Sequence, residues 1–595
     1  MDSAGINPDN WRLGTLVLED GNLQIDIVDG ELPQFILDAN DAVKMGEIEE
    51  ATNILNKDSV EAFHEKLERD GCRTVVLLAV AKLFFDTDQL AEAEQWYLKI
   101  VEREPHAFVY NAIADICVAQ RRISEAAKYR KKAVETDPEN KAYWLNYAMS
   151  LVLTGRRDEG LELLRKRVEM APADDNAAGS VLLWQLHYVP GSTPEMFFEE
   201  YEKWGRTYLP MSMAKSSYNN DPDPDRRLRI GYISPDFRDN VVSKSFEPFL
   251  DGHDRGRFEV YGYGNIAKPD KVTKRLKEKF DHYRNIHRMS IGQAAELVEK
   301  DQIDILIEIG GHCRDNCLTV LGLKPAPVQV DYGGVDTSGM QQIDYRLTDR
   351  LMTPVDMEKF YVEESACLPG GIYSYRPPRS SPLVGPLPAK RNSYPTYASF
   401  NNSVKINPFT MELWARILNA DANSRLVLKF FGGNDPGLQE YYRGELERLG
   451  ICRERVEFYD MFSSHFVHMD LYNEVDIMLD TCPFSGCMTT LEGLWMGVPT
   501  ISLVGESMAF SRSGLSILSR VGLEIFAAST ADEYVGKAIA FSRELDNLEK
   551  IRASLRQTML DSDLCKPKRL TDEIEAAYRK MWHRWCEKQT ARVTA

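Results

Sequence analysis

A repeated pattern between residues 74 and 172 constrains the fold of this chain most strongly. Three similar segments, "AEAEQWYLKIVEREP", "ISEAAKYRKKAVETDP" and "DEGLELLRKRVEMAP", end in prolines that are 33 and 34 residues apart (Pro105, Pro138 and Pro172). Small residues recur at matching places in both helices expected for each unit (Ala81, Ala114 and Ala148; Ala93, Ala126 and Gly160). Large residues recur four positions before the first set (Leu77, Tyr110 and Trp144). Self-similarity at this period predicts stacked pairs of helices.

The pattern resembles the 34-residue tetratricopeptide repeat. Arrays of such repeats form concave surfaces that bind other proteins, so residues 71–205 are predicted to be tetratricopeptide repeats that recruit an acceptor protein. The alternative is that the helices only brace a neighbouring domain. Stacked repeats need a capping unit, so residues 1–70 are predicted to be a helical N-terminal cap or a degenerate repeat.

A change of composition marks the end of the helical arm. Residues 206–227 include "MSMAKSSYNNDPDPDRR", which is rich in Asn, Asp, Ser and Pro and is typical of a linker. From Leu228 short apolar strands alternate with amphipathic helices, and after the Pro-rich stretch at 377–388 the alternation begins again. This predicts two doubly wound Rossmann-like domains with parallel sheets, 228–388 on the acceptor side and 389–595 on the nucleotide-sugar side, the second carrying a C-terminal helix.

Bulk composition excludes several classes of protein. No apolar run is long enough to cross a bilayer, and the first residues lack the features of a signal peptide. The net charge of −19 argues against a general nucleic-acid binder. The ten cysteines include no pattern with zinc-finger spacing. We therefore expect a cytoplasmic protein with reduced thiols and no membrane or nucleic-acid partner.

Polar residues follow the predicted strands of the second domain, at the sheet edge where ligands bind. The stretch "ASFNNSVKINP" places Asn402 and Lys405 between a strand and a helix start, which suits a phosphate. His465 and His468 are three residues apart and share a helix face. No third metal ligand is apparent near them in the sequence, so we expect no metal site, and the open alternatives are stacking on a nucleobase or plain exposure.

The stretch "TCPFSGCMTTLEGLWMG" has the strongest chemical signal. Thr489 and Thr490 open a helix whose free N–H groups suit a phosphate. Glu492 is expected in the first turn of that helix, where its carboxylate would accept hydrogen bonds from ribose hydroxyls. The alternative is that Glu492 only compensates the helix dipole.

Four stretches in order resemble the catalytic region of the protein O-GlcNAc transferase family in its short bacterial form: "RLRIGYISPDFRDN", "LKPAPVQVDYGG", "FNNSVKINP" and "DIMLDTCPFSGCMTTLEGLWMGVPTISLVG". The resemblance runs from about Arg227 to the C-terminus, and that family also carries a tetratricopeptide arm. It implies an α-helical tetratricopeptide repeat arm followed by an α/β GT-B fold, with metal-independent chemistry and no cofactor besides a nucleotide-sugar donor.

The resemblance also implies a role for each candidate residue. Asn402 and Lys405 would contact the donor phosphate and sugar, with Lys405 stabilising the leaving phosphate. The remaining donor contacts would be to the base (His465 and His468), to the diphosphate (Thr489 and Thr490) and to the ribose (Glu492).

The sequence departs from the family on the sugar side of the site. Asn240 and Lys244 stand where the family has histidines, Cys487 replaces another histidine, and Met488 replaces a threonine. The stretch "YGGVDTSG" at 332–339 also differs from the family's "WLGYPGTTG". The resemblance implies UDP-GlcNAc as donor, but these changes leave open a CMP-nonulosonic acid, with flagellin as a plausible acceptor.

The missing histidine leaves the catalytic base to be found among residues after strands of the first domain. Asp236 follows the strand "LRIGYIS" after one proline, and His312 follows "IDILIEIG" through Gly310 and Gly311. Either is expected to act as general base, although Asp236 could instead cap a turn and His312 bond the backbone. The chain is predicted to be a protein O-glycosyltransferase; the alternatives are a non-catalytic scaffold or secretion chaperone, and a transferase acting on small molecules.

Overall fold

A computed structural model describes residues 16–19, 22–25, 38–40, 42–43, 48–55, 74–170, 176–332 and 336–594. The chain divides into two compact units. The first comprises Met1–Leu163 with Asp435–Leu438, and the second comprises Leu164–Asn434 with Gln439–Ala595.

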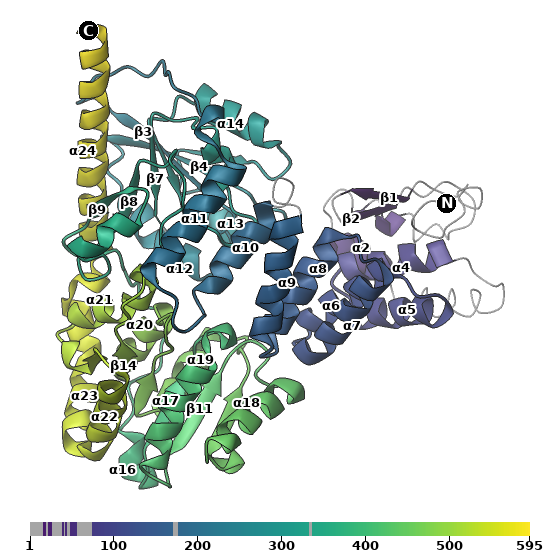
Figure 1. Cartoon of the computed structure of the whole chain (residues 1–595), viewed down its shortest axis with the longest axis vertical. Helices are drawn as coiled ribbons and strands as arrows, with labels where there is room; N and C mark the ends of the chain where they lie inside the picture. The colour runs from purple at the N-terminus through teal and green to yellow at the C-terminus, as the bar shows by residue number, and fades with distance from the viewer. Residues whose placement is uncertain are drawn as a thin grey trace. The chain divides into compact units, whose positions relative to one another are not determined.

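Helix pairs at the predicted period build the first unit (Figure 1). They are α4 (Thr74–Asp86) with α5 (Leu90–Arg103), α6 (Ala107–Ala119) with α7 (Ile123–Thr136), and α8 (Lys141–Leu153) with α9 (Arg157–Met170). The recurring alanines are fully buried. At Gly160 an added Cβ would lie 2.7 Å from the Ala148 carbonyl oxygen, so only glycine allows these two helices to approach. The predicted repeats are confirmed for these three pairs; Pro172 lies outside the described residues.

The N-terminal region differs from the prediction of a helical cap at residues 1–70. Strands β1 (Leu16–Glu19) and β2 (Asn22–Ile25) pair antiparallel, and α2 spans Ile48–Ile54. Most of the remaining residues in this range lie outside the described part of the chain.

Helices α10 (Asn176–Leu186) and α11 (Pro194–Tyr208) belong to the second unit, although the prediction extended the repeats to residue 205. Helix α11 packs tightly on the loop that follows strand β7 (Val328–Asp331) of the first sheet. A Cβ on Gly205 would lie 2.0 Å from the carbonyl oxygen of Gly339, and one on Gly339 would lie 2.1 Å from that of Tyr201. Two facing glycines therefore let α11 contact this loop. The predicted linker after α11 contains the short 3₁₀ helix η2 (Met211–Met213).

The first sheet has seven parallel strands in the order β5-β4-β3-β6-β7-β8-β9. The strands are β3 (Leu228–Ser234), β4 (Phe258–Gly264), β5 (His282–Asn285), β6 (Ile305–Glu308), β7 (Val328–Asp331), β8 (Tyr345–Thr348) and β9 (Glu364–Cys367). The connecting helices include α12 (Val241–Leu250), α13 (Lys271–Lys277), α14 (Ile291–Lys300) and α15 (Leu318–Gly322). The inner strands β3 and β6 lie in the predicted strands "LRIGYIS" and "IDILIEIG". The edge strands β5 and β9 are half exposed and lack an apolar run, so the pattern did not reveal them.

The second sheet has six parallel strands in the order β12-β11-β10-β13-β14-β15. They are β10 (Thr396–Ser399), β11 (Arg425–Lys429), β12 (Val456–Tyr459), β13 (Ile477–Leu479), β14 (Thr500–Leu503) and the short β15 (Ala527–Ala528). Its helices are α16 (Pro388–Asn392), α17 (Pro408–Asn419), α18 (Pro436–Arg448), α19 (His465–Asp470), α20 (Met488–Trp495), α21 (Ser513–Ser519), α22 (Ala531–Arg543) and α23 (Leu545–Asp561).

The last helix, α24 (Pro567–Thr594), returns to the first sheet (Figure 1). Ile574 and Trp582 are buried in the same core as Leu228 and Ile230 of β3. This corrects the prediction that grouped the C-terminal helix with the second domain, because apolar periodicity shows that a helix is buried but not against which sheet. Two doubly wound domains joined in this way confirm the predicted GT-B fold.

Among the described residues, no helix combines the length and the apolar character that crossing a membrane requires.

Candidate functional site

The two sheets direct the carboxyl ends of their strands toward a shared region. Ser516 of α21 donates a hydrogen bond of 2.6 Å to Asp349, which follows β8 of the first sheet. Burial lowers the pKa of His465 on α19, and the charge of Lys244 on α12 of the first domain lowers it further. Loops at the carboxyl edges of both sheets are therefore close together, which is where ligands bind in folds of this class.

Lys405 lies on the second-domain side of this region, at the end of a 3₁₀ turn (Ser403–Lys405) after β10. Its Nζ donates a hydrogen bond of 2.8 Å to the Ser485 carbonyl oxygen and lies 3.9 Å from the centre of the Phe484 ring. Burial lowers the pKa of Lys405 to about 8, against the opposing charge of Asp480. Of its three ammonium donors, one is used within the described residues, which leaves two for an anion. Asn402, exposed beside it, caps the turn by accepting a hydrogen bond from the Val404 N–H.

The N-terminus of α20 forms a cradle opposite Lys405. A Cβ on Gly486 would lie 2.8 Å from Thr489 Oγ1, 2.9 Å from Thr490 Oγ1 and 3.1 Å from Asn401 Oδ1. The absence of a side chain at Gly486 therefore keeps three polar groups and the free N–H groups of the helix start together. This arrangement suits a phosphate.

Asp480, which the sequence analysis did not single out, holds this cradle in place. Its buried carboxylate accepts hydrogen bonds from the backbone N–H of Gly486 (2.6 Å) and of Thr481 (2.9 Å) and from Ser502 Oγ (2.7 Å). Burial raises the pKa of Asp480 despite these bonds and the nearby charge of Lys405. The position of this aspartate at the end of the strand "VDIMLD" was the sequence signal that could have identified it.

Glu492 is brought together with the two predicted histidines. His468 Nε2 donates a hydrogen bond of 2.8 Å to Glu492, and Tyr472 OH donates one of 3.4 Å. Burial would raise the pKa of Glu492, but the His468 hydrogen bond and the nearby positive charges hold it below its usual value. The prediction that Glu492 lies in the first turn is wrong: α20 begins at Met488, so Glu492 lies in the second turn.

The prediction that the histidines have no third partner capable of binding metal also needs correction. One ligand atom each from His465, His468 and Glu492 lies within 4.8 Å of the other two. Glu492 is 24 residues from His468 in the sequence, so their proximity arises from the packing of α19 beside α20. Two of the three groups already interact, through the His468–Glu492 hydrogen bond.

Asp236 lies at the carboxyl edge of the first sheet, where it was predicted. The amide of Asn240 donates a hydrogen bond to its Oδ1, and the Cys313 thiol lies 3.9 Å from its Oδ2. Burial raises the pKa of Asp236, although Arg238 and these hydrogen bonds oppose the rise. Asn240 also caps α12 by accepting a hydrogen bond of 2.9 Å from the Ser243 N–H. The asparagine that replaces the family's histidine therefore orients a carboxylate.

His312 does not occupy the position of a catalytic base. Its Nε2 donates a hydrogen bond of 2.9 Å to the Ser338 carbonyl oxygen, and its Nδ1 accepts one of 3.1 Å from Ser180 Oγ on α10. The rings of Tyr201 and Trp204 on α11 pack edge-on against it. Burial lowers the pKa of His312 to about 4. The predicted role as base is corrected, because both nitrogens are used inside a packed junction.

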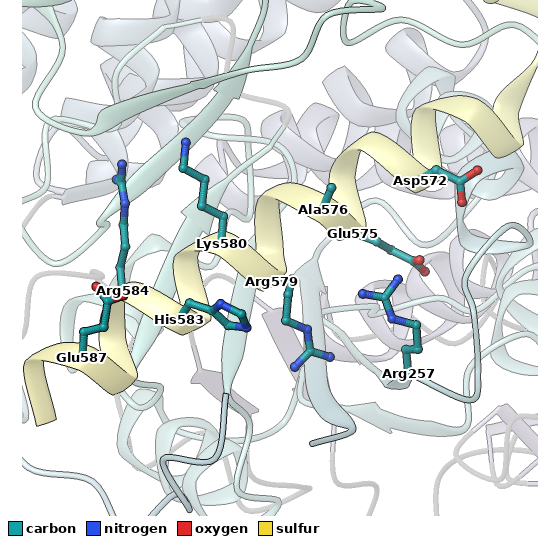
Figure 2. A pocket seen from close by; sticks show the side chains of 9 residues that line it. All are labelled: Arg257, Asp572, Glu575, Ala576, Arg579, Lys580, His583, Arg584 and Glu587. Carbon is teal, nitrogen blue, oxygen red and sulfur yellow. The ribbon is translucent and has the colours of Figure 1, made fainter. Parts of the chain in front are cut away.

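A separate groove runs along α24 (Figure 2). Figure 2 shows basic side chains beside it, among them Arg257, Arg579, Lys580 and Arg584. Arg257 directly precedes β4, so this groove lies at the amino-terminal edge of the first sheet, away from the edge that carries Asp236. Several of its charges are already paired within the chain, including Arg579 with the Pro224 carbonyl oxygen at 2.7 Å. It does not form part of the candidate site.

Comparison with known proteins identifies the family. The sequence model for Glycosyl transferase family 41 matches residues 211–374 and 391–574, which are the two sheet domains. The chain belongs to glycosyl transferase family 41. It is 36% identical over 419 residues to a protein of Hordeum vulgare named "Probable UDP-N-acetylglucosamine--peptide N-acetylglucosaminyltransferase SPINDLY". That alignment covers 70% of this chain and 44% of the barley protein, so the chain matches less than half of that relative's length.

Two further known proteins are similar to this chain. A protein of Arabidopsis thaliana named "Probable UDP-N-acetylglucosamine--peptide N-acetylglucosaminyltransferase SEC" is 29% identical over 378 residues, which cover 61% of this chain and 38% of that protein. A solved structure of a lysine-to-methionine mutant of the Thermobaculum terrenum O-GlcNAc transferase is 31% identical, with a TM-score of 0.81. It covers 87% of this chain and 98% of that one. The similarity therefore extends beyond the two sheet domains into the helical arm.

Proposed function

We propose that this member of family 41 is a protein O-glycosyltransferase that moves a sugar from a nucleotide-sugar donor to Ser or Thr of an acceptor protein. One observation carries the proposal: Lys405 faces the phosphate cradle of α20, and Glu492 follows one turn later on the same helix. That order of groups matches the order of diphosphate and ribose in a nucleotide. A non-catalytic scaffold would have no use for it.

The chemistry proposed for the site uses only the chain's own side chains. Lys405 stabilises the negative charge that develops on the leaving diphosphate. The amino end of α20 holds the phosphates, Glu492 accepts hydrogen bonds from the ribose, and the rings of His465 and His468 contact the base. Asp236 takes the proton from the acceptor hydroxyl. No metal ion or cofactor is needed in this scheme.

For the donor we propose UDP-GlcNAc, because the relatives are named for UDP-N-acetylglucosamine. Cys487 and Asn240, which differ from the family pattern, support a CMP-nonulosonic acid as the alternative donor and flagellin as its acceptor. We place the reaction in the cytoplasm, because the nine cysteines of the described residues are all free thiols.

The identity of the donor can be tested directly. Purified chain is incubated with candidate acceptors, including flagellin, and with UDP-, GDP- and CMP-sugars, and the intact mass of each acceptor is measured. We expect a mass increase of one N-acetylhexosamine with UDP-GlcNAc. An increase only with a CMP-nonulosonic acid would select the alternative donor, and no increase with any donor would favour a scaffold.

The repeat arm supports acceptor binding through its asparagines. Asn111 on α6 and Asn146 on α8 occupy successive repeats, and the Asn146 amide donates a hydrogen bond of 3.1 Å to Asn111 Oδ1. Asn111 in turn donates one of 3.1 Å to Asp115. Amide groups of this kind donate to and accept from a peptide backbone regardless of its sequence. We propose that they bind an extended part of the acceptor.

Replacing Asn111 and Asn146 together by alanine is expected to lower kcat/KM for a protein acceptor about 10-fold, the scale of two lost hydrogen bonds of about 0.7 kcal/mol each. Steady-state kinetics at saturating donor would measure this, and the donor KM should not change. Substitution of the exposed Lys131 and Glu135 of α7 provides the control. An unchanged kcat/KM for the protein acceptor would place recruitment elsewhere.

Replacing Glu492 by alanine is expected to weaken nucleotide binding by about 1–3 kcal/mol, because a hydrogen bond to a carboxylate is lost. Calorimetric titration with the nucleoside diphosphate of the active donor measures the change. Glu492→Gln keeps the shape and serves as the matched variant, with a smaller loss. If both variants are folded and bind as the wild type does, Glu492 has only a structural role.

A further inference from the structure

Lys429, a residue that the proposed chemistry does not use, ends strand β11 in an unusual environment. Its side chain is only 2% exposed. Among the described residues the hydrogen-bond partner of its Nζ is the Met461 sulfur at 3.5 Å, a weak acceptor. The Phe400 ring centre lies 5.6 Å from this Nζ. Among the residues that the structure describes, no carboxylate oxygen lies within ion-pair distance of this Nζ. Burial of an ammonium group without a strong partner is costly, and burial lowers the pKa of Lys429 to about 8.

The position of Lys429 relates it to the nucleoside rather than to the phosphates. In the second sheet β11 lies between β10 and β12, whereas β13, which leads to the phosphate cradle, lies on the other side of β10. Strand β12 leads to α19, which carries His465 and His468. Burial has the largest effect on the pKa of Lys429 and lowers it, whereas the negative charge of Glu492 raises it. Burial also has the largest effect on the pKa of His465, and the positive charge of Lys429 lowers that pKa further. Lys429 is therefore close to the groups assigned to ribose and base.

Glu492 and Lys429 differ in their hydrogen-bonding chemistry and therefore suit different parts of a nucleoside. Glu492 can only accept hydrogen bonds, which suits ribose hydroxyls, whereas Lys429 can only donate them. Aromatic rings lie beside it: Phe400 is 4.7 Å from Tyr472 and 6.3 Å from His468 between ring centres. We infer that Lys429 donates a hydrogen bond to a carbonyl oxygen of the donor's nucleobase. Uracil, cytosine and guanine carry such an oxygen and adenine does not, so Lys429 makes the site select against adenine nucleotides.

This inference rests on the proposed function, and its test separates the two. The full chain is titrated calorimetrically with UDP, CDP, GDP, ADP and inorganic pyrophosphate. For the tightest nucleoside diphosphate, Lys429→Met is expected to weaken binding about 10- to 100-fold, the range of a hydrogen bond from a charged donor. Affinity for pyrophosphate should not change, and the preference over ADP should fall. Lys429→Arg should retain part of the affinity, and Lys537→Met, which removes a half-buried lysine of α22, should retain all of it.

A second measurement separates base from ribose. The 2′-deoxy form of the tightest nucleotide is titrated against wild type and Lys429→Met. If Lys429 contacts the base, the losses of binding free energy caused by Lys429→Met and by removal of the 2′-hydroxyl add together. A combined loss no greater than the larger single loss would assign Lys429 to the ribose and overturn the inference. Thermal unfolding serves as the folding control, and Lys429→Met should unfold at the same or a higher temperature because a buried unpaired charge is removed.

The outcomes distinguish the inference from the function on which it rests. If Lys429→Met binds every nucleotide within twofold of the wild type while Glu492→Ala weakens binding, the inference is wrong and the donor site stands. If the wild type binds no nucleoside diphosphate, the proposed function itself fails. If affinity for pyrophosphate falls as much as affinity for the nucleotide, Lys429 contacts phosphate and not the base.

Discussion

Lys405→Ala is expected to reduce sugar transfer by about 1,000-fold or more, effectively to background. The leaving diphosphate gains negative charge as the glycosidic bond breaks, and the Lys405 ammonium is the cation placed against the phosphate cradle. Removal of one preorganised donor to a developing charge typically costs about 100- to 1,000-fold in turnover, and here no metal ion is proposed to compensate. Single-turnover transfer to the acceptor, measured by intact mass, gives the result.

The matched variant for this prediction is Lys537→Met, which removes a half-buried lysine from α22 of the same domain and should retain full transfer. Lys405→Arg keeps the charge and should recover part of the activity lost in Lys405→Ala. If Lys405→Ala transfers sugar at a rate within 10-fold of the wild type, electrostatic assistance by Lys405 is not the main catalytic device.

Asp236→Asn is expected to lower turnover about 100-fold, within the usual range for loss of a general base. Asn240 and Cys313 orient the carboxylate, and burial raises its pKa. A carboxylate with a raised pKa acts as a base above that pKa. Its activity as a base is lost as the pH falls through the pKa. In the wild type, kcat/KM should therefore begin to fall at a higher pH than an ordinary aspartate would give, and this acidic limb should be absent in Asp236→Asn.

Asp239→Asn is the control for Asp236, because Asp239 is an exposed aspartate in the same loop. It should transfer sugar as the wild type does. If Asp236→Asn also keeps near-wild-type turnover while Lys405→Ala is inactive, the proton leaves by another route and only leaving-group stabilisation remains. His312→Ala is not a test of the base, because it would disturb the packing between α10, α11 and the first domain.

The parts of the site that the sequence predicted correctly are local in the chain. Thr489 and Gly486 form one turn and helix start, so three or four consecutive residues reveal a phosphate cradle. Lys405 lies in the short connection between strand β10 and a capped helix, which is again a short-range signal. The helix pairs were equally readable, because Ala93 and Ala126 repeat at the spacing of the unit.

What the sequence could not reveal depends on contacts between distant segments. His312 follows two glycines at a strand end, which led to its prediction as a catalytic residue, but its partner Ser180 is 132 residues away. Lys429 ends a strand and resembles any solvated lysine until its burial is known. Helix α24 carries a clear apolar face, yet the sequence does not say that Trp582 packs in the core of the first domain and not of the second.

The central claim is that the nucleotide binds at the carboxyl edge of the second sheet, between Lys405 and α20. A crystal structure of the chain with the nucleoside diphosphate of its active donor tests this most directly. We predict that the β-phosphate lies within hydrogen-bond distance of Lys405 Nζ and of the Thr489 and Thr490 N–H groups, with the ribose hydroxyls against Glu492. A nucleotide bound at the edge of the first sheet, or in the groove along α24, would contradict the account.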